Sequence, residues 1–264
     1  MKPPRVLAVA AHPDDIEFMM AGTLLELGAA GFELHYMNLA SGSCGSTIEN
    51  AARTRIRRAR ESRSAARILG AHYHASLADD IEIFYTPKLL RTIAAIVRAV
   101  APSIILTHSL EDYMEDHTNT ARLVVTAAFV RGMPNYRTQP RRASMEGEIT
   151  IYHALPHGLR DAMNRRVTPE SYVDVGGVHT TKMEALAAHR SQQRWLSASQ
   201  GMPSYLEEME ATSREVGRMS RRFALAEGWR RHNPLGFCAA AADPLRAALG
   251  QKHAHNPLYR RVAG

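Results

Sequence analysis

The sequence predicts a single α/β domain whose mostly parallel sheet is doubly wound, as in Rossmann-like folds. Two apolar runs without alternation, Val6–Ala11 and 103–107, are typical of strands buried on both faces of a parallel sheet. Segments with apolar residues at helical spacing alternate with strands through about residue 130, which indicates a doubly wound sheet. At 264 residues, 45% of them hydrophobic, the chain is long enough to bury a substantial core.

The expected elements follow one another in chain order, and Gly or Pro stands where a helix should end. Gly70 suits the C-terminal end of one helix. Ala101-Pro102 ends another helix before a strand begins. We expect strands at 6–11, 32–39, 103–107 and 149–152, and helices at 16–25, 53–70, 89–100, 120–125 and 180–196.

One domain should cover residues 1–264, with its core at about 5–231. Residues 134–148 mix Pro and Gly with polar residues, and we interpret them as a linker within this domain. The extension after about residue 239 is Ala-rich and then polar, so we expect a frayed terminus there.

The composition excludes several classes of protein. The formal net charge is +7, but the basic residues are scattered and aromatic residues make up only 6%. A nucleic-acid-binding face gathers basic residues together with stacking aromatics, so we expect no nucleic-acid partner. No apolar stretch approaches the ~20 residues that span a bilayer. The first residues lack the apolar region of a signal peptide. Two cysteines are too few for a disulfide framework. We therefore expect a cytoplasmic protein without a membrane partner, and homo-oligomerisation stays open.

Polar clusters follow two of the predicted strands. The turn His12–Asp15 comes directly after the strand at 6–11, and a cluster that ends in Asp116-His117 follows the strand at 103–107. In open α/β sheets, ligands bind beyond the carboxyl ends of the strands. Two such ends can face one crevice, so the two clusters are expected to meet.

The residue types in these clusters suit a metal. Two imidazoles and one carboxylate, from His12, Asp15 and His117, suit Zn²⁺, and three protein ligands with an open fourth position are the arrangement of a catalytic zinc site. Asp14 could then act on the metal-bound water. A solvated turn in which an Asp caps the following helix is the alternative.

Three motifs in these regions resemble those of the LmbE-like (PIG-L) family of zinc-dependent N-deacetylases: Ala11–Asp15, Ala21–Leu24 and Asp116-His117. The likeness continues, in the family's order and across about 5–231, in Arg58, Glu61, Ala65-Ala66, Leu69-Gly70, Tyr172–Val175, Lys182, Ala185, His189–Gln192 and Ala226–Gly228. The resemblance implies an enzyme that removes an N-acyl group from an N-acetylglucosamine-type amino sugar or its conjugate, with a small amino sugar as its partner.

The resemblance also implies roles for single residues. His12, Asp15 and His117 would bind zinc, with Asp14 as the general base. Arg58 and Tyr205 fall where the family has substrate-contacting residues, and His189 is a recurrent feature that we group with them. Whether His189 touches substrate or only shapes the site stays open.

The chain departs from the family at Met114. The family usually has His-Pro-Asp-His there, and its first histidine helps to stabilise the oxyanion, whereas this chain has Met114–His117. Methionine donates no hydrogen bond, and loss of one oxyanion donor costs about 10²–10³ in rate. Tyr205, His189 or His157 would have to donate instead, or catalysis would rely more on zinc. An amidase that cleaves a larger amide conjugate, and a zinc-binding protein with little turnover, therefore remain alternatives.

Overall fold

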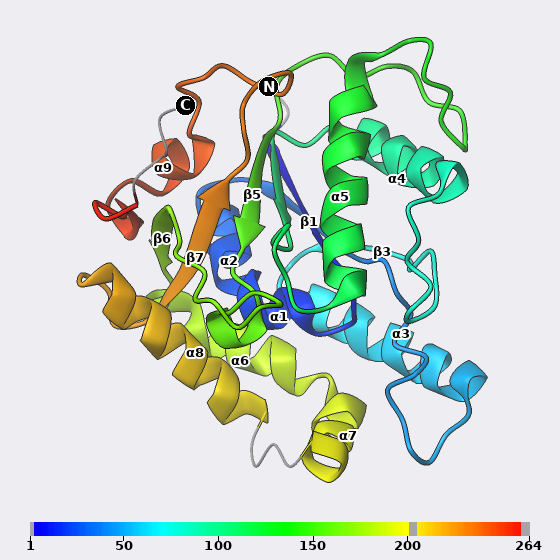
Figure 1. The fold of residues 1–264 in the computed structure, drawn as a ribbon, viewed down its shortest axis with the longest axis vertical. Helices are drawn as coiled ribbons and strands as arrows, with labels where there is room; N and C mark the ends of the chain where they lie inside the picture. Colours follow the sequence, from blue (N-terminus) through cyan, green and yellow to red (C-terminus); the bar gives the residue numbers. More distant parts are fainter. Residues whose placement is uncertain (1–2, 201–204, 260–264) are drawn as a thin grey trace.

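The computed structural model describes residues 3–200 and 205–259, without the side chains of 194 and 197–200. Within these ranges, eight strands form one sheet in the order β3-β2-β1-β4-β5-β7-β6-β8 (Figure 1). The strands are β1 (Arg5–Ala10), β2 (Glu33–Asn38), β3 (His72–His74), β4 (Ile104–Thr107), β5 (Thr150–Ala154), β6 (Ser171–Asp174), β7 (Ala226–Arg231) and β8 (His253–His255). The helices are α1 (Asp15–Met19), α2 (Ala21–Ala29), α3 (Ala51–Ile68), α4 (Pro87–Val100), α5 (Glu115–Phe129), α6 (His179–Ala187), α7 (Arg190–Gln200), α8 (Tyr205–Ser220) and α9 (Pro244–Leu249).

The parallel part of the sheet contains β3, β2, β1, β4 and β5. β1 lies between β2 and β4, with Val6 aligned to Leu34 on one side and to Ile104 on the other. The carboxyl ends of β1 and β4 are therefore neighbours at one edge of the sheet. The polar clusters that follow these two strands consequently meet there, as the sequence predicted.

The rest of the sheet is antiparallel. β7 runs against both β5 and β6, and β8 runs against β6. The expected α/β domain with a mostly parallel sheet is confirmed in this mixed form. The expectation of a frayed end after about residue 239 is wrong for the described residues, because α9 packs there and β8 pairs with β6 through Val173 and His253.

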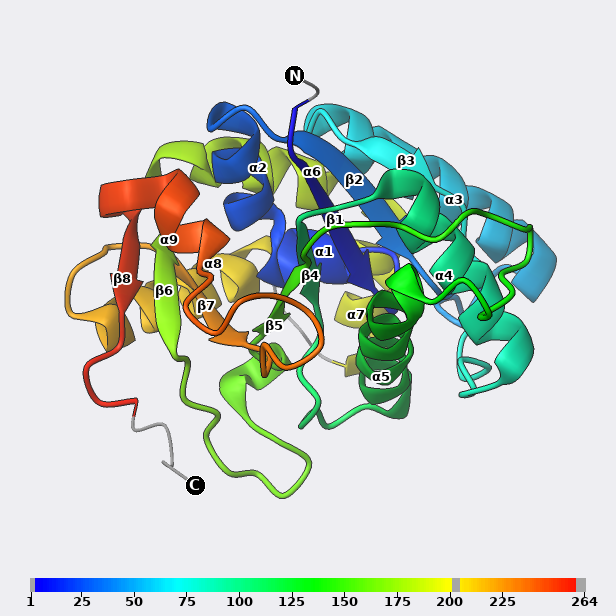
Figure 2. The ribbon, with the colours of Figure 1, turned by 90° about the horizontal axis from the view of Figure 1, so that it is seen from above.

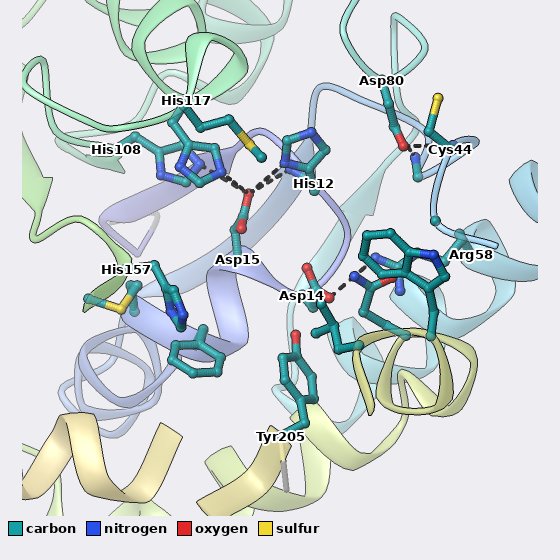
Figure 3. Close-up of a pocket in the computed structure, with 18 of the residues that line it drawn as sticks. His12, Asp14, Asp15, Cys44, Arg58, Asp80, His108, His117, His157 and Tyr205 are labelled. Carbon is teal, nitrogen blue, oxygen red and sulfur yellow. Dashed lines mark hydrogen bonds and ion pairs between the residues drawn. The ribbon is translucent and has the colours of Figure 1, made fainter. Parts of the chain in front are cut away.

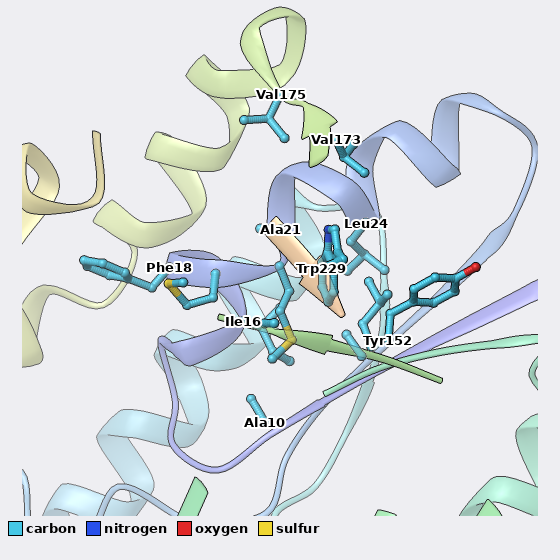
Figure 4. Packing of buried hydrophobic residues seen from close by; sticks show 14 of the residues in the cluster. Ala10, Ile16, Phe18, Ala21, Leu24, Tyr152, Val173, Val175 and Trp229 are labelled. Atoms are coloured by element: carbon cyan, nitrogen blue, oxygen red, sulfur yellow. The ribbon is translucent and has the colours of Figure 1, made fainter. Parts of the chain in front are cut away.

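Apolar side chains cover both faces of the sheet, because successive residues of a strand point to opposite faces. Val6, Ala8 and Ala10 face a cluster that includes residues of α1, α2, α3, α6 and α8. The intervening residues of β1 face a second cluster, built with α4 and α5 (Figure 2). Figure 4 shows the first cluster where Trp229 of β7 and Leu24 of α2 meet. Trp229 is fully buried, and its indole N–H donates to Thr23 Oγ1 at 2.9 Å.

Two predicted helices are broken, and one starts early. The helix expected at 16–25 is α1 plus α2, because Met20 between them has a non-helical φ of −135°. The helix expected at 180–196 is α6 plus α7, with His189 between them. α5 begins at Glu115 rather than at 120, so its first turn contains His117. No described helix is both long and apolar enough to cross a membrane.

A buried ion pair fixes the start of α2. The Glu227 carboxylate accepts the backbone N–H groups of Gly22 and Thr23 at 2.8 and 2.7 Å, and Lys182 Nζ donates to it at 2.8 Å. A Cβ at Gly22 would lie 2.4 Å from Val175 Cγ1, so only glycine fits this approach. Several residues of the resemblance thus hold the fold together rather than touch a ligand.

Candidate metal centre and cavity

The turn after β1 sends two adjacent carboxylates in different directions. Asp14 has a left-handed backbone with φ 109°, which is strained for a residue other than glycine. Asp15 Oδ2 accepts the His12 backbone N–H at 2.7 Å and faces the two predicted histidines. Asp14 points instead toward Arg58 and Tyr205 (Figure 3). One carboxylate can therefore bind a cation while its neighbour acts on a substrate.

His12, Asp15 and His117 each offer one ligand atom, and these atoms lie within 4.8 Å of one another. His12 Nδ1 and His117 Nε2 are each 3.4 Å from Asp15 Oδ2. Ligands bound tetrahedrally at 2.0–2.1 Å would be about 3.3 Å apart, so the three groups are already close to the spacing of a zinc site. The structure brings the predicted ligands together.

The other ring nitrogens of both histidines are held by carboxylates. His12 Nε2 lies 2.9 Å from Asp116 Oδ2, and His117 Nδ1 lies 3.0 Å from Asp112 Oδ1. A carboxylate behind a ligating histidine fixes its tautomer and orientation, and it raises the basicity of the nitrogen that faces the metal. The sequence analysis did not assign this role to Asp112 or Asp116.

The pKa shifts of the two histidines indicate that the carboxylates around them favour an added positive charge. Burial opposes protonation of His12, but hydrogen bonds to Asp116 and Asp15 outweigh it and raise the pKa of His12 to about 10. Burial likewise opposes protonation of His117, and the charge of Asp15 raises the pKa of His117 to about 9. Two imidazoles and a carboxylate at ligand spacing, with this excess of negative charge around them, form a donor set that fits a divalent cation.

Asp14 is buried beside the metal group. Burial raises the pKa of Asp14 above its usual value, although the nearby Arg58 guanidinium and a hydrogen bond from Tyr205 oppose this effect. Arg58 Nη2 lies 3.3 Å from Asp14 Oδ2 and also donates to the Pro13 carbonyl oxygen. A carboxylate with a raised pKa is a better proton acceptor near neutral pH.

These groups line one cavity of about 250 Å³. Its wall includes all three predicted ligands together with Asp14, Arg58 and Tyr205. Met114, at the start of α5, also lines the cavity, as does His157. Burial lowers the pKa of His157, so its ring is neutral at pH 7 and retains one N–H donor.

His189 lies outside this cavity. Its side chain is fully buried between α6 and α7, and its Nε2 is 3.3 Å from Glu17 Oε1. Glu17 also accepts the Tyr36 hydroxyl at 3.2 Å. The structure therefore places the His189 side chain in a buried polar group behind the turn, and that side chain does not line the cavity.

Other cavity residues escaped the sequence analysis. His108 follows β4 directly, stacks on His117 with ring centroids 4.0 Å apart, and has Nε2 3.2 Å from Asp15 Oδ2. Its position directly after a predicted strand was the signal that could have identified it. Asp80, in the loop before α4, lines the cavity and accepts the backbone N–H groups of Gly42 and Cys44 at 2.7 and 2.8 Å.

The chain is similar to several known proteins. Residues 7–128 match the PIG-L family, described as GlcNAc-PI de-N-acetylase. The chain is 29% identical over 196 residues to diacetylchitobiose deacetylase of Thermococcus kodakarensis, a match that covers 71% of this chain and 70% of that protein. It is 25% identical over 195 residues to 4-oxalmesaconate hydratase of Pseudomonas putida, which covers 71% and 73% of the two proteins. The solved structure of N,N'-diacetylchitobiose deacetylase from Pyrococcus horikoshii has a similar fold, with a TM-score of 0.72 and 21% identity, over 92% of this chain and 89% of that one.

Proposed function

We propose that this chain, a member of the PIG-L family, is a zinc-dependent hydrolase that removes an N-acyl group from an N-acetylglucosamine-type amino sugar or its conjugate. One observation supports this function above the others. His12, Asp15 and His117 lie at the spacing of metal ligands, and Asp14, which is not one of these three residues, faces the same cavity. Metal-assisted amide hydrolysis uses both an ion site and a separate general base.

The metal would be held by His12 Nδ1, Asp15 Oδ2 and His117 Nε2, with a fourth position open to the cavity. When bound, zinc supplies an activated water and polarises the acyl oxygen. Two nitrogens and one oxygen at this spacing favour zinc over magnesium or calcium, which prefer oxygen ligands.

Asp14 would act as the general base. It takes a proton from the attacking water as the new C–O bond forms at the acyl carbon. It then gives a proton to the sugar nitrogen as the C–N bond breaks, so that the amine leaves in neutral form. The Arg58 guanidinium and the Tyr205 hydroxyl hold the carboxylate in place during both transfers.

Met114 stands where the family has a histidine, so either another group donates to the oxyanion or catalysis relies more on zinc. Tyr205 and His157 both line the cavity, whereas His189 does not. The Tyr205 hydroxyl already bonds to Asp14. His157 is neutral and keeps an N–H, so it is the second candidate donor.

Metal analysis and acid release test the proposal together. The zinc-loaded protein should release carboxylic acid from N-acyl glucosamines and chitobiose, and His117→Ala should lose both zinc and activity. Stoichiometric zinc without acid release from any amide would favour the zinc-binding alternative. Activity on large amide conjugates alone would favour the amidase. Hydration of 4-oxalmesaconate, with no amide cleavage, would point to the chemistry of the Pseudomonas relative and refute the deacetylase.

A further inference from the structure

We propose that the acyl group removed by this protein is larger than acetyl and binds against an apolar wall formed by Phe18, Met19 and Met114, with the His157 ring packed against Phe18 at its edge. This wall is one side of the cavity described above, and the inference rests on the proposed amide hydrolysis. It concerns the chemical class of the substrate, because a sugar that carries a longer N-acyl chain is a different compound from an N-acetyl sugar.

The cavity has two unlike sides. Asp80, Cys44 and Arg58 lie on one side of Asp15, and His157 lies on the other (Figure 3). Gln192 of α7 also lines the cavity and packs so closely on the loop after β2 that a Cβ at Gly45 would lie 2.9 Å from Gln192 Oε1. Trp195 and Leu196 of the same helix line the cavity too and add an apolar surface on which a sugar ring can pack. A carboxylate, a guanidinium and an amide are the groups that recognise sugar hydroxyls.

The opposite side presents rings and thioethers. The Phe18 ring meets the His157 ring edge-on with centroids 4.7 Å apart, and it lies 5.5 Å from the Tyr205 ring. Met19, the next residue of α1, lines the cavity beside Phe18, and Met114 lines it from the start of α5. Aromatic rings give a fixed apolar surface, and thioethers adapt to the shape of an alkyl chain.

The geometry of an amide connects these two sides. Its acyl chain and its nitrogen substituent leave the carbonyl carbon in different directions. With that carbon between Asp14 and Asp15, a sugar on the polar side directs the acyl chain to the apolar wall. An acetyl methyl group would leave most of this wall without a partner, whereas each added methylene that it covers strengthens binding about fourfold.

Two further observations extend the apolar path. Met114 stands where the family resemblance places a histidine, so this chain has a thioether in place of a polar ring on the wall. Ile81 and Tyr113 line the same cavity although their side chains are 62% and 49% exposed, so they give it an apolar mouth. An acyl chain that is too long for the cavity can therefore extend outward over the apolar atoms at its mouth.

The experiment compares N-acetyl-, N-butyryl- and N-hexanoyl-glucosamine on the zinc-loaded protein. We expect kcat/KM to rise about fifteenfold from acetyl to butyryl, since two methylenes are buried. A fall in kcat/KM from acetyl to butyryl would overturn the inference and leave the proposed deacetylase intact. Calorimetric binding of the same sugars to Asp14→Asn gives a readout without turnover. If affinity rises with the length of the acyl chain but the unaltered protein hydrolyses none of the sugars, the acyl wall is upheld and the proposed function is refuted. If affinity does not change with acyl length, the inference is overturned.

Variants test the wall itself. Met114→Leu keeps an apolar group and should keep the butyryl-to-acetyl ratio, whereas Met114→His should lower it about fourfold. The histidine in Met114→His could also donate to the oxyanion, but this would change the rates on the acetyl and butyryl substrates alike. The butyryl-to-acetyl ratio therefore reports only the contact between residue 114 and the acyl chain. Met19→Gln, which keeps the length of the side chain, should also lower the ratio. Leu235→Ser, at an exposed site outside the cavity, is the control and should leave the ratio unchanged.

Discussion

The buried ion pair between Lys182 and Glu227 should control the stability of the whole domain. Both side chains are almost inaccessible to solvent, at 0% and 3% exposed, and Glu227 also accepts the two backbone N–H groups at the start of α2. Replacing Glu227 with Gln leaves the Lys182 ammonium buried without a counter-charge. Loss of one partner of such a pair costs about 3–5 kcal/mol of the free energy of unfolding.

The partner substitution should be milder. Lys182→Met keeps the volume of the side chain and leaves the Glu227 carboxylate with its two backbone donors at a helix N-terminus, which favour the negative charge. We expect a loss of about 2–3 kcal/mol. The double variant removes both charges, so it should lose no more than Glu227→Gln alone, and the coupling between the two sites should be about 2 kcal/mol or more.

Urea denaturation of the zinc-loaded protein at pH 7 measures these free energies, provided that the slope with denaturant stays constant. Glu210→Gln, which breaks the exposed pair with Arg214, is the matched control and should leave the midpoint unchanged. If the two single losses simply add in the double variant, the charges do not interact and our account of this pair is wrong.

Three further predictions concern the site and its surroundings. Asp14→Asn should keep zinc and lower kcat about 10²–10⁴-fold; loss of zinc in that variant would make Asp14 a ligand and reverse the roles of the two carboxylates. Tyr205→Phe should lower turnover more than Met114→Leu does, because the hydroxyl holds Asp14 whereas the thioether contributes only shape; an unchanged rate in Tyr205→Phe would turn attention to His157 as the donor. Burial lowers the pKa of His153 to about 4. The unfolded state therefore binds a proton at this histidine more tightly than the folded state does. The contribution of neutral His153 to the free energy of unfolding is fully present above pH 6.5 and should fall by up to about 3 kcal/mol as the pH drops toward 4. His153→Asn, which can still donate to the His108 carbonyl oxygen, should flatten this part of the pH profile in urea titrations, and an unchanged slope would show that another group is responsible.

The sequence alone was sufficient for four of the five parallel strands and for the proposed ligands, but it did not predict β3. β1 and β4 are short, continuous apolar runs, and that pattern follows from burial on both faces. His12, Asp14 and Asp15 are contiguous, and His117 follows the neighbouring strand. A rule about strand ends was therefore enough to bring them together.

Only the tertiary structure determined which groups face the cavity. The opposite directions of Asp14 and Asp15 depend on a left-handed backbone at Asp14, which a sequence pattern does not specify for a residue other than glycine. The break at His189 turns that side chain toward Glu17 instead of the cavity. Local patterns gave no reason to distinguish this outcome from a substrate contact.

The antiparallel half of the sheet was also decided by long-range pairing. β7 inserts between β5 and β6 although it follows both in the chain, and β8 pairs with β6 from beyond residue 250. β8 has only three residues, and β7 lacks an apolar run, so neither pattern identifies a strand by itself. Their partners are selected by contacts between distant segments. The sequence therefore specified the chemistry at the strand ends, while the packing of the second half of the chain decided the walls of the cavity around it.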